Sequence, residues 1–298
     1  MKNKYKTKFK TIFLKYKIKF KTILLLYYLY YISNDITNNN KNKFIIKKLT
    51  KVSVILPIFN KENYLKRSIG SIRNQTLQNI EIVAINDCST DNSLYILKKL
   101  AKKDIRIKII NNDRNHGPLY TRAMGILNTS GEYIMSVDPD DRLEGVDNLE
   151  LLYNKSQVTK ADYVRFLLKR IPRNDSEIDQ LNLIDKNQLI SEDFLLTNKF
   201  IKRNIIFKAY LFFKKKIFSN HWRYHNDNIW NFLIRKYSKS EAILNKYIYI
   251  YKRNNESCML NINTINEIRD RIYRFEIIQE INKNVDINQY IRFYKNIF

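Results

Sequence analysis

The segment VSVILPIFNKE, residues 52–62, opens the part of the chain whose pattern decides the fold. Its first five residues form a nearly continuous apolar run of strand length, and Pro57 is expected to end that strand. Apolar residues then recur at helical spacing, which predicts a helix over 62–75. The chain therefore begins this region with a strand followed directly by a helix.

The same unit repeats along the next 75 residues. Further strands are predicted over 80–85, 105–110 and 133–137. The helices between them are expected after Ser89 or Thr90, either of which can cap a helix start, and over 118–129. Strands that alternate with helices through short links predict an α/β fold with a mostly parallel sheet and helices on both faces.

Polar and acidic side chains follow each of the four predicted strands. They lie in the stretches 57–62, 86–91, 115–117 and 138–141. Open sheets of this kind bind ligands beyond the carboxyl ends of their strands. Since all four stretches would lie at that edge, the sequence predicts a ligand site there.

The stretch after the fourth strand is the most acidic of the four. Asp138, Asp140 and Asp141 are nearly adjacent, and such carboxylates repel one another unless a cation or a donor lies between them. Oxygen ligands suit Mg²⁺ or Mn²⁺, which often bridge one or two carboxylates to substrate phosphates. The alternative is a solvated acidic turn built around Pro139. The position directly after a strand favours the metal site.

Composition adds a second, weaker set of constraints. The 298 residues carry a formal net charge of +25, and residues 1–51 supply +13 of it through fourteen Lys and one acidic residue. Nucleic acid or an anionic membrane is one interpretation of this charge, and Lys filling ordinary solvated positions is the other. We favour the second, and expect no nucleic-acid partner. The cysteines, Cys88 and Cys258, indicate no disulfide framework and favour a reducing, cytoplasmic compartment.

The first fifty residues are expected to form a basic extension. Its apolar run, ILLLYYLYYI at 23–32, is too short for a spanning helix and lacks a signal-peptide cleavage site. A basic flank followed by a Tyr-rich apolar run would suit membrane-surface association through residues 1–32. The alternative is a helix packed on the rest of the chain. Residues 33–43 have the composition of a linker.

The second half carries weaker signals. We expect a strand over 161–168, a polar surface excursion over 172–192 and a helix over about 199–218. Asp227 precedes a helical pattern, where a carboxylate caps free amides, and it is also a candidate general base. His221 and His225 share a spacing with zinc pairs, but no third ligand is evident, so metal binding there is not expected.

Four motifs in the first half carry a family resemblance. They are Val52 to Asn60, Asn86 to Ser93, Asn115 to Gly117 with Thr121 to Ala123, and Gly131 to Asp141. In order and spacing they resemble glycosyltransferase family 2, an inverting, nucleotide-sugar-dependent family with the Rossmann-like GT-A fold. The resemblance covers about 90 residues and implies a transferase of the hexosyltransferase type.

The resemblance implies roles for the matching residues. Asp87 would hydrogen-bond the base of the nucleotide, and Glu62 would lie near the base or ribose. Asp138 would contact the ribose or the donor sugar, with Arg122 near the donor. Asp140 would be the main ligand of a divalent cation, Mn²⁺ or Mg²⁺.

Other parts of the donor site and the acceptor side follow from the same resemblance. Pro57, Phe59 and Asn60 match the first strand and nucleotide loop, and Gly117 matches the third motif. Asp227 corresponds to the catalytic base of inverting members. A UDP-sugar is the favoured donor, while the acceptor would be a hydroxyl of a glycan, lipid or protein, as in polysaccharide biosynthesis.

Asn226 stands where the family has a Glu before the catalytic Asp, and two residues of the second motif also depart from the family pattern. Asn86 replaces the usual first Asp of the second motif, which removes a charge near the nucleotide. Cys88 replaces a Gly, which puts a side chain where the family has a more permissive backbone.

The expected organisation has four parts. A basic extension over 1–50 precedes a nucleotide-sugar-binding GT-A core over 51–170. An acceptor-side part of the catalytic domain follows over 171–260, including a closing strand at 247–251. Helices of unassigned role are expected over 261–298.

Two competing functions remain to be weighed. A nucleotidyltransferase also uses a parallel sheet with acidic metal ligands, but it would carry a Gly- and Lys/Arg-rich loop after the first strand, where this chain has PIFN. A non-catalytic basic membrane- or nucleic-acid-binding protein with a decayed transferase core would have lost carboxylates. Asp87, Asp138, Asp140 and Asp227 all remain.

Overall fold

The computed structural model describes residues 50–171, 196–217 and 226–252. Several expectations therefore lie outside the described residues: the basic extension and its apolar run, the excursion over 172–192, the residues His221 and His225, and the helices over 261–298. The described part is an α/β fold built on one sheet.

The strands, in chain order, are β1 (Val52–Ile58), β2 (Ile80–Asn86), β3 (Ile107–Asn111), β4 (Tyr133–Ser136), β5 (Arg142–Leu143), β6 (Tyr163–Ile171), β7 (Lys199–Lys202) and β8 (Glu241–Lys252). They form an eight-stranded sheet in the order β3-β2-β1-β4-β7-β6-β8-β5. The first four strands pair in parallel, while β7 is antiparallel to both β4 and β6. The sheet is thus mixed, with the predicted parallel part at one side.

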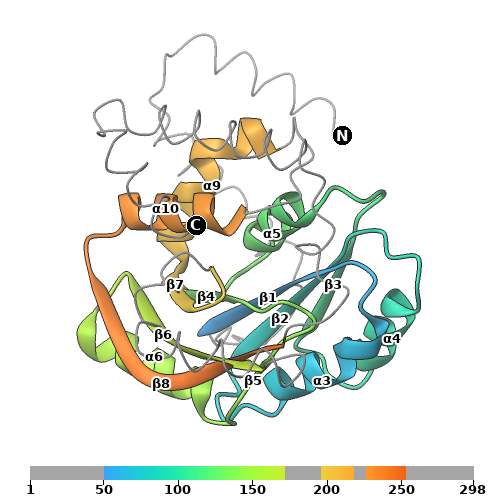
Figure 1. Cartoon of the computed structure of the whole chain (residues 1–298), viewed down its shortest axis with the longest axis horizontal. Coiled ribbons are helices and arrows are strands. Elements are labelled where there is room, and N and C mark those ends of the chain that lie inside the picture. Colours follow the sequence, from blue (N-terminus) through green and yellow to red (C-terminus); the bar gives the residue numbers. More distant parts are fainter. Residues whose placement is uncertain (1–49, 172–195, 218–225, 253–298) are drawn as a thin grey trace, which may run out of the picture. The chain divides into compact units, whose positions relative to one another are not determined.

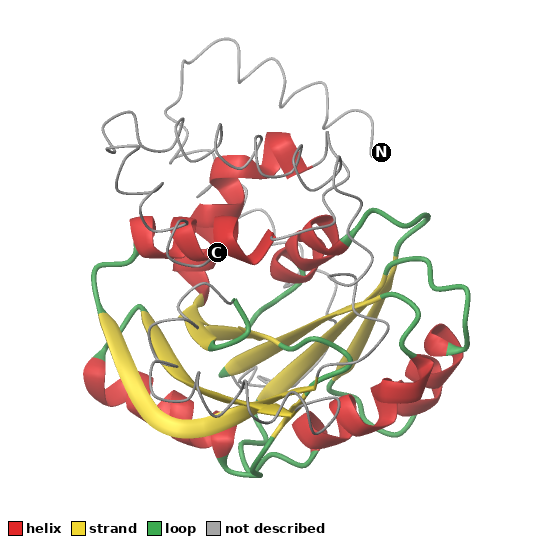
Figure 2. Cartoon of the chain, in the orientation of Figure 1, coloured by secondary structure: helices red, strands yellow, loops and turns green. Residues whose placement is uncertain are grey.

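Six described helices cover the two faces of the sheet: α3 (Glu62–Arg73), α4 (Ser93–Ala101), α5 (Pro118–Leu127), α6 (Asn148–Thr159), α9 (Arg203–Ile217) and α10 (Asn226–Tyr237). Figure 1 shows α3, α4 and α6 on one face and α5, α9 and α10 on the other. In Figure 2 the same helices enclose a twisted sheet. The expected helices on both faces are confirmed.

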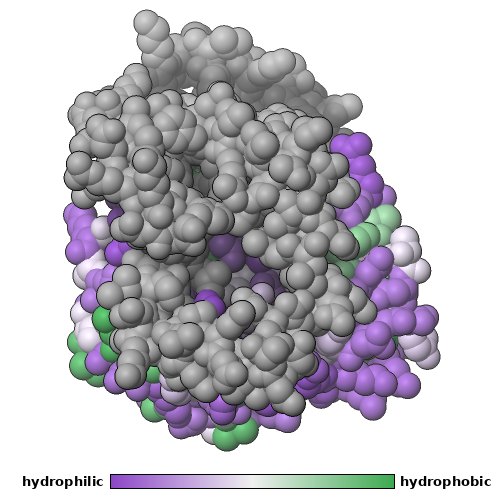
Figure 3. All heavy atoms as spheres, in the orientation of Figure 1, coloured by the Kyte–Doolittle hydropathy of each residue, from purple (hydrophilic) through white to green (hydrophobic). Residues whose placement is uncertain are grey.

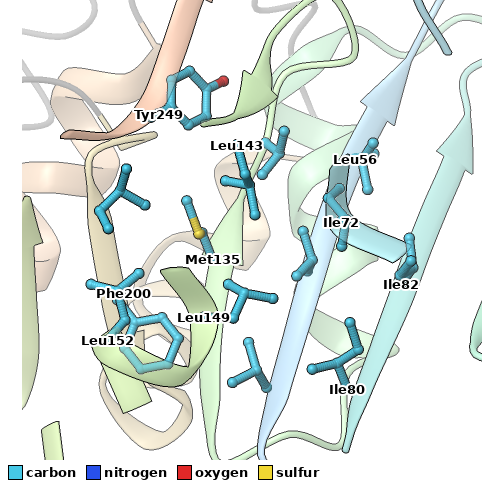
Figure 4. Packing of buried hydrophobic residues seen from close by; sticks show 14 of the residues in the cluster. Leu56, Ile72, Ile80, Ile82, Met135, Leu143, Leu149, Leu152, Phe200 and Tyr249 are labelled. Carbon is cyan, nitrogen blue, oxygen red and sulfur yellow. The ribbon is translucent and has the colours of Figure 1, made fainter. Parts of the chain in front are cut away.

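Each face has its own apolar core, because side chains of a strand alternate between the faces. Val54 and Leu56 of β1 pack with the core under α3, α4 and α6, whereas Ile55 packs with that under α5, α9 and α10. Figure 4 shows Leu56, Met135 and Phe200 within the first of these clusters. A strand buried on both faces explains why residues 52–58 read as a continuous apolar run.

The first strand continues through Pro57, so the expectation that this proline ends it is wrong. The carbonyl of Ile55 accepts a hydrogen bond from Val137 on the β4 side, and that of Ile58 accepts one from Asp87 on the β2 side. The position of Pro57 between them directs its missing N–H toward β4. Since the β1–β4 pairing ends at Ile55 and Ser136, no donor is needed there.

Two predicted starts also differ from the structure. β3 begins at Ile107, and Ile105 is 96% exposed. α4 begins at Ser93 rather than after Ser89 or Thr90, and its start is held by Asp91, whose Oδ1 accepts from the N–H of Ser93. Neither predicted residue caps the helix, because the loop before it bonds to the loop after β1 instead.

The second half differs more from expectation. Residues 199–202 form β7, not the first turn of a helix, and α9 starts at Arg203. Ile201 of β7 pairs with Ile134 and with Tyr163, so the segment fills the gap between two strands. Tertiary pairing outweighs local helical preference here. β6 matches the strand expected over 161–168, and β8 is longer than the strand expected over 247–251.

In Figure 3 the described residues that are visible are mostly hydrophilic, with apolar residues scattered among them. Within the described ranges, no helix has the length and apolar character to cross a membrane.

Candidate active site

The site lies where the parallel strands end. β1, β2 and β4 are neighbours and end at Ile58, Asn86 and Ser136. The polar stretches that follow them meet at this edge, as the sequence predicts.

The loops after β1 and β2 are joined by hydrogen bonds. The amide side chain of Asn60 donates to Thr90 Oγ1 at 3.1 Å and accepts from the Thr90 N–H at 2.8 Å. Glu62 Oε2 accepts from the Asn92 N–H at 2.8 Å. Asn60 and Glu62, both expected to bind substrate, thus also fix one loop against the other.

Two residues of these loops have left-handed backbones, Asn60 with φ 49° and Cys88 with φ 58°. Asn tolerates this region well, whereas most other side chains are strained in it. The Cys88 position is therefore one that Gly would suit, in line with the departure noted in the sequence.

Asp87 organises the loop after β3. It is 3% exposed, and its Oδ1 accepts from Asn112 Nδ2 at 2.7 Å and from the His116 N–H at 3.0 Å. Its Oδ2 accepts from the Gly117 N–H at 2.8 Å. Gly117 has φ 86° and is the N-cap of α5, so Asp87 fixes where that helix begins. Three internal hydrogen bonds occupy much of the carboxylate that we expected to bind the base.

Arg122 joins the acidic loop to the second half of the chain. It lies on α5, and its side chain is only 7% exposed. Nη2 donates to Asp138 Oδ1 at 2.8 Å, and Nη1 lies 3.3 Å from Asp227 Oδ1. Asp227 is in the first turn of α10, as expected. Asp138 and the candidate base therefore share one guanidinium.

Asp140 is held by two cationic side chains from the region of α3. Lys61 Nζ lies 2.8 Å from Asp140 Oδ2, and the two side chains are 16% and 19% exposed. Arg67 Nη2 donates to the backbone carbonyl of Asp140 at 2.8 Å. The loop after β4 is thus anchored to the loop after β1.

Asp141 is buried and bonds to β8. Its Oδ2 accepts from the Tyr249 hydroxyl at 2.7 Å, and its Oδ1 accepts from the Lys252 N–H at 2.9 Å. The Tyr249 oxygen in turn accepts from the Asp138 N–H at 3.0 Å. In Figure 4 the Tyr249 hydroxyl points away from the apolar side chains labelled around it. One tyrosine therefore links Asp138 and Asp141.

Burial dominates the electrostatics of the acidic loop. It raises the pKa of Asp138, with Arg122 opposing the shift. Burial, together with the charges of Asp138 and Asp140, raises the pKa of Asp141 to about 8. Burial acts to lower the pKa of Arg122, but Asp227 and Asp138 outweigh it and raise this pKa. Carboxylates this close need cations to stay ionised together.

The donor set fits a hard divalent cation that is completed by phosphates. Among the described residues, no three His, Cys, Asp or Glu side chains are grouped so as to hold a metal by themselves. Mg²⁺ and Mn²⁺ commonly use one or two carboxylates and take their other ligands from substrate phosphates and water. Asp140, partly exposed at the sheet edge, suits such an incomplete site.

The remaining predicted residues take different positions. Pro57 lies half-buried in β1, and Phe59, the first residue after that strand, is 42% exposed. Sequence reasoning missed Lys61 and Tyr249. Lys61 could have been found, since it follows β1 as Asp140 follows β4, and both loops lie at one edge. Tyr249 could not, because it depends on the position of β8.

The fold and the acidic loop after β4 define the class of protein, since together they are those of a GT-A domain. The chain belongs to glycosyl transferase family 2, whose family model matches residues 53–238. The fold and family expected from the four motifs are confirmed, and the chain carries a transferase domain.

Curated relatives match shorter stretches. The chain is 45% identical over 112 residues to "Glycosyltransferase GlyA" of Streptococcus pneumoniae, which covers 38% of this chain and 16% of that protein. It is 34% identical over 142 residues to an uncharacterized glycosyltransferase of Haemophilus influenzae, covering 45% and 56%. A cholesterol galactosyltransferase of Borreliella burgdorferi is 38% identical over 129 residues, covering 41% and 36%. The matches span from about a sixth to little over half of these relatives' lengths.

Two solved structures share the fold. Staphylococcus aureus TarS 1–349, crystallised with UDP-GlcNAc, has a TM-score of 0.59 at 21% identity and covers 72% of this chain and 62% of its own. The mannosyltransferase PcManGT of Pyrobaculum calidifontis, in complex with GDP-Man and Mn²⁺, has a TM-score of 0.57 at 13% identity, covering 77% and 64%.

Proposed function

We propose that this domain transfers a sugar from a nucleoside-diphosphate sugar to an acceptor hydroxyl, with inversion at the anomeric carbon. The observation that carries the proposal is the position of Arg122, 2.8 Å from Asp138 and 3.3 Å from Asp227. It joins the donor-side loop and the candidate base in a single site. Family membership and two fold neighbours with bound nucleotide sugars support the same reaction.

Asp227 is assigned the role of general base. It would accept the proton of the acceptor hydroxyl as that oxygen forms its bond to the anomeric carbon. The bond between that carbon and the diphosphate oxygen breaks, and the nucleoside diphosphate leaves with the electron pair. The location of Asp227 at a helix start, with 20% of its side chain exposed, leaves its carboxylate accessible to an acceptor.

Asp140 would hold the divalent cation, Mn²⁺ or Mg²⁺, and that cation, when bound, would neutralise the charge of the leaving diphosphate. Arg122 would add a fixed positive charge beside the donor and orient Asp138 toward its sugar or ribose. The loops that Asp87, Asn60 and Glu62 hold together would form the nucleotide side of the site. We favour a UDP-sugar as donor and a glycan, lipid or protein hydroxyl as acceptor.

Membrane-surface association through residues 1–32 and a cytoplasmic location remain proposals that rest on the sequence. They predict that the full chain binds anionic vesicles and that a variant lacking residues 1–43 does not.

A donor screen tests the proposed reaction. Release of nucleoside diphosphate is measured with UDP-, GDP- and dTDP-sugars, Mn²⁺ and a panel of glycan and lipid acceptors. Asp227→Asn should lose transfer while it keeps donor binding, because the amide keeps the shape of the side chain but cannot accept the proton. Asp147→Asn, which removes a partly exposed carboxylate paired with Lys246, is the charge-matched control. Unchanged transfer in Asp227→Asn would remove it as the base.

A further inference from the structure

Lys61 occupies the carboxylate to which the proposed function assigns the divalent cation. Its ammonium lies 2.8 Å from Asp140 Oδ2 and 5.5 Å from the centre of the Tyr64 ring, within the range of a cation–π contact. Both side chains of the ion pair are mostly enclosed, at 16% and 19% exposure. A built-in cation thus stands where an incoming one would bind.

The two cations cannot share this oxygen without cost. Two like charges about 4 Å apart repel each other, and they do so more strongly at the effective dielectric of a protein surface than in bulk water. A divalent ion on Asp140 would double that repulsion toward Lys61. The ammonium must therefore move away or weaken the binding of the ion.

The diphosphate of the donor is an alternative partner for the Lys61 ammonium. A nucleoside diphosphate brings negative charge to this edge of the sheet, and an ammonium is a good point-charge partner for phosphate. We propose that Lys61 competes with the divalent cation for Asp140, and that the donor diphosphate relieves this competition by drawing the Lys61 ammonium away. This inference rests on the proposed donor site and adds an order in which the donor and the divalent cation bind there.

The chain separates the role of the Lys61 side chain from that of its backbone. The Lys61 N–H donates to Ser93 Oγ at 2.9 Å, and its side chain makes no cap at the start of α3. Arg67 contacts the carbonyl of Asp140 and not its carboxylate. Lys61→Met should therefore remove this ammonium from the carboxylate while the loop and the helix keep their positions.

The test is a Mn²⁺ titration of the purified full chain without nucleotide, followed by the electron paramagnetic resonance signal of free Mn²⁺. Lys61→Met should bind Mn²⁺ about three- to tenfold more tightly than the unaltered protein, the range expected for one partly exposed ion pair. Lys61→Arg should stay close to the unaltered protein. Lys66→Met removes the same charge from an exposed position on α3 and is the matched control.

A second arm repeats the titration with UDP. UDP should tighten Mn²⁺ binding more in the unaltered protein than in Lys61→Met, because only the former has a competitor to displace. The double variant Lys61→Met/Asp140→Asn should lose the gain seen in Lys61→Met.

The outcomes separate this inference from the proposed function. Equal Mn²⁺ affinity in Lys61→Met and the unaltered protein, with weaker binding in Asp140→Asn, would overturn the competition and leave the metal site standing. A gain of the same size in Lys66→Met would also overturn it, because general charge would then explain the effect. Mn²⁺ affinity that does not change when Asp140 is replaced would overturn both the competition and the metal assignment. The donor screen tests sugar transfer separately.

Discussion

Arg122 is the residue through which the two halves of the candidate site meet. Its guanidinium contacts Asp138 from the loop after β4 and Asp227 from the start of α10. A buried guanidinium with two carboxylate partners stabilises both of their charged forms. The sequence motif indicated Arg122 near the donor, but only the packing of α5 against α9 and α10 brings Asp227 to it.

Replacing Arg122 with Met should therefore damage both stability and activity. The change leaves Asp138 and Asp227 without their shared cation, and breaking such a buried pair costs on the order of 3 kcal/mol. Urea unfolding should show that loss, and transfer should fall by orders of magnitude. Arg122→Lys keeps the charge but cannot contact both carboxylates in a fork, so it should restore stability more than transfer. An unfolding free energy unchanged in Arg122→Met would contradict this role.

At the level of elements, the contact between β1 and the turn before β4 is unusually close. A Cβ added to Gly131 would lie 2.5 Å from Ser53 Oγ and 2.6 Å from the backbone N of Ser53. The Gly131 N–H donates to Ser53 Oγ at 2.8 Å, and Glu81 accepts from both residues. The turn therefore lies directly against the start of β1.

Gly131→Ala should destabilise the fold by roughly 3 kcal/mol, since backbone atoms of β1 cannot move away from the new methyl group. Thermal unfolding measures the loss. Gly70→Ala is the matched control: nothing lies within 4 Å of its added Cβ, and Ala favours a helix over Gly by up to about 1 kcal/mol. The control should melt at the same temperature or higher. Equal effects of the two changes would contradict the close approach.

Asp104 stabilises the turn between α4 and β3 through ion pairs with two arginines. The guanidinium of Arg106 and then that of Arg73 hold the pKa of Asp104 well below its usual range, against the effect of burial. A carboxylate with a lowered pKa in the folded state contributes stability above its unfolded pKa, near 3.9, and loses it as pH falls toward the folded value. Asp104→Asn should thus lower stability at pH 7, with a gap from the unaltered protein that narrows below about pH 4.

Chemical unfolding at several pH values measures this gap. Asp147→Asn, whose carboxylate is half-exposed, should show a smaller gap at every pH. A gap that widened in acid would contradict the ion-pair account.

The elements that sequence predicted well are those with strong local patterns. The four parallel strands and α3, α4 and α5 all appear, since each carries an apolar run or a helical repeat. β7 was missed because its residues form a strand only when β4 and β6 lie on either side of it. The Lys61–Asp140 and Tyr249–Asp141 contacts were missed for a similar reason, since they join residues about 80 and 108 positions apart.

For the molecule as a whole, the predicted donor and acceptor parts share one sheet. β7 lies between β4 and β6, and β8 pairs with both β6 and β5. The described part of residues 171–260 therefore does not form a separate layer. The functional division between donor and acceptor parts remains a prediction, which follows the roles assigned to Asp140 and Asp227.

The most direct test of the central claim is the Mn²⁺-dependent release of nucleoside diphosphate by the unaltered chain and by Asp140→Ala, with the best donor and acceptor from the screen. The account predicts turnover that a chelator stops and added Mn²⁺ restores, and none measurable in Asp140→Ala. Lys66→Met, outside the site, should keep full turnover. Full turnover in Asp140→Ala would contradict the metal assignment, and no turnover by the unaltered chain with any donor would contradict sugar transfer itself.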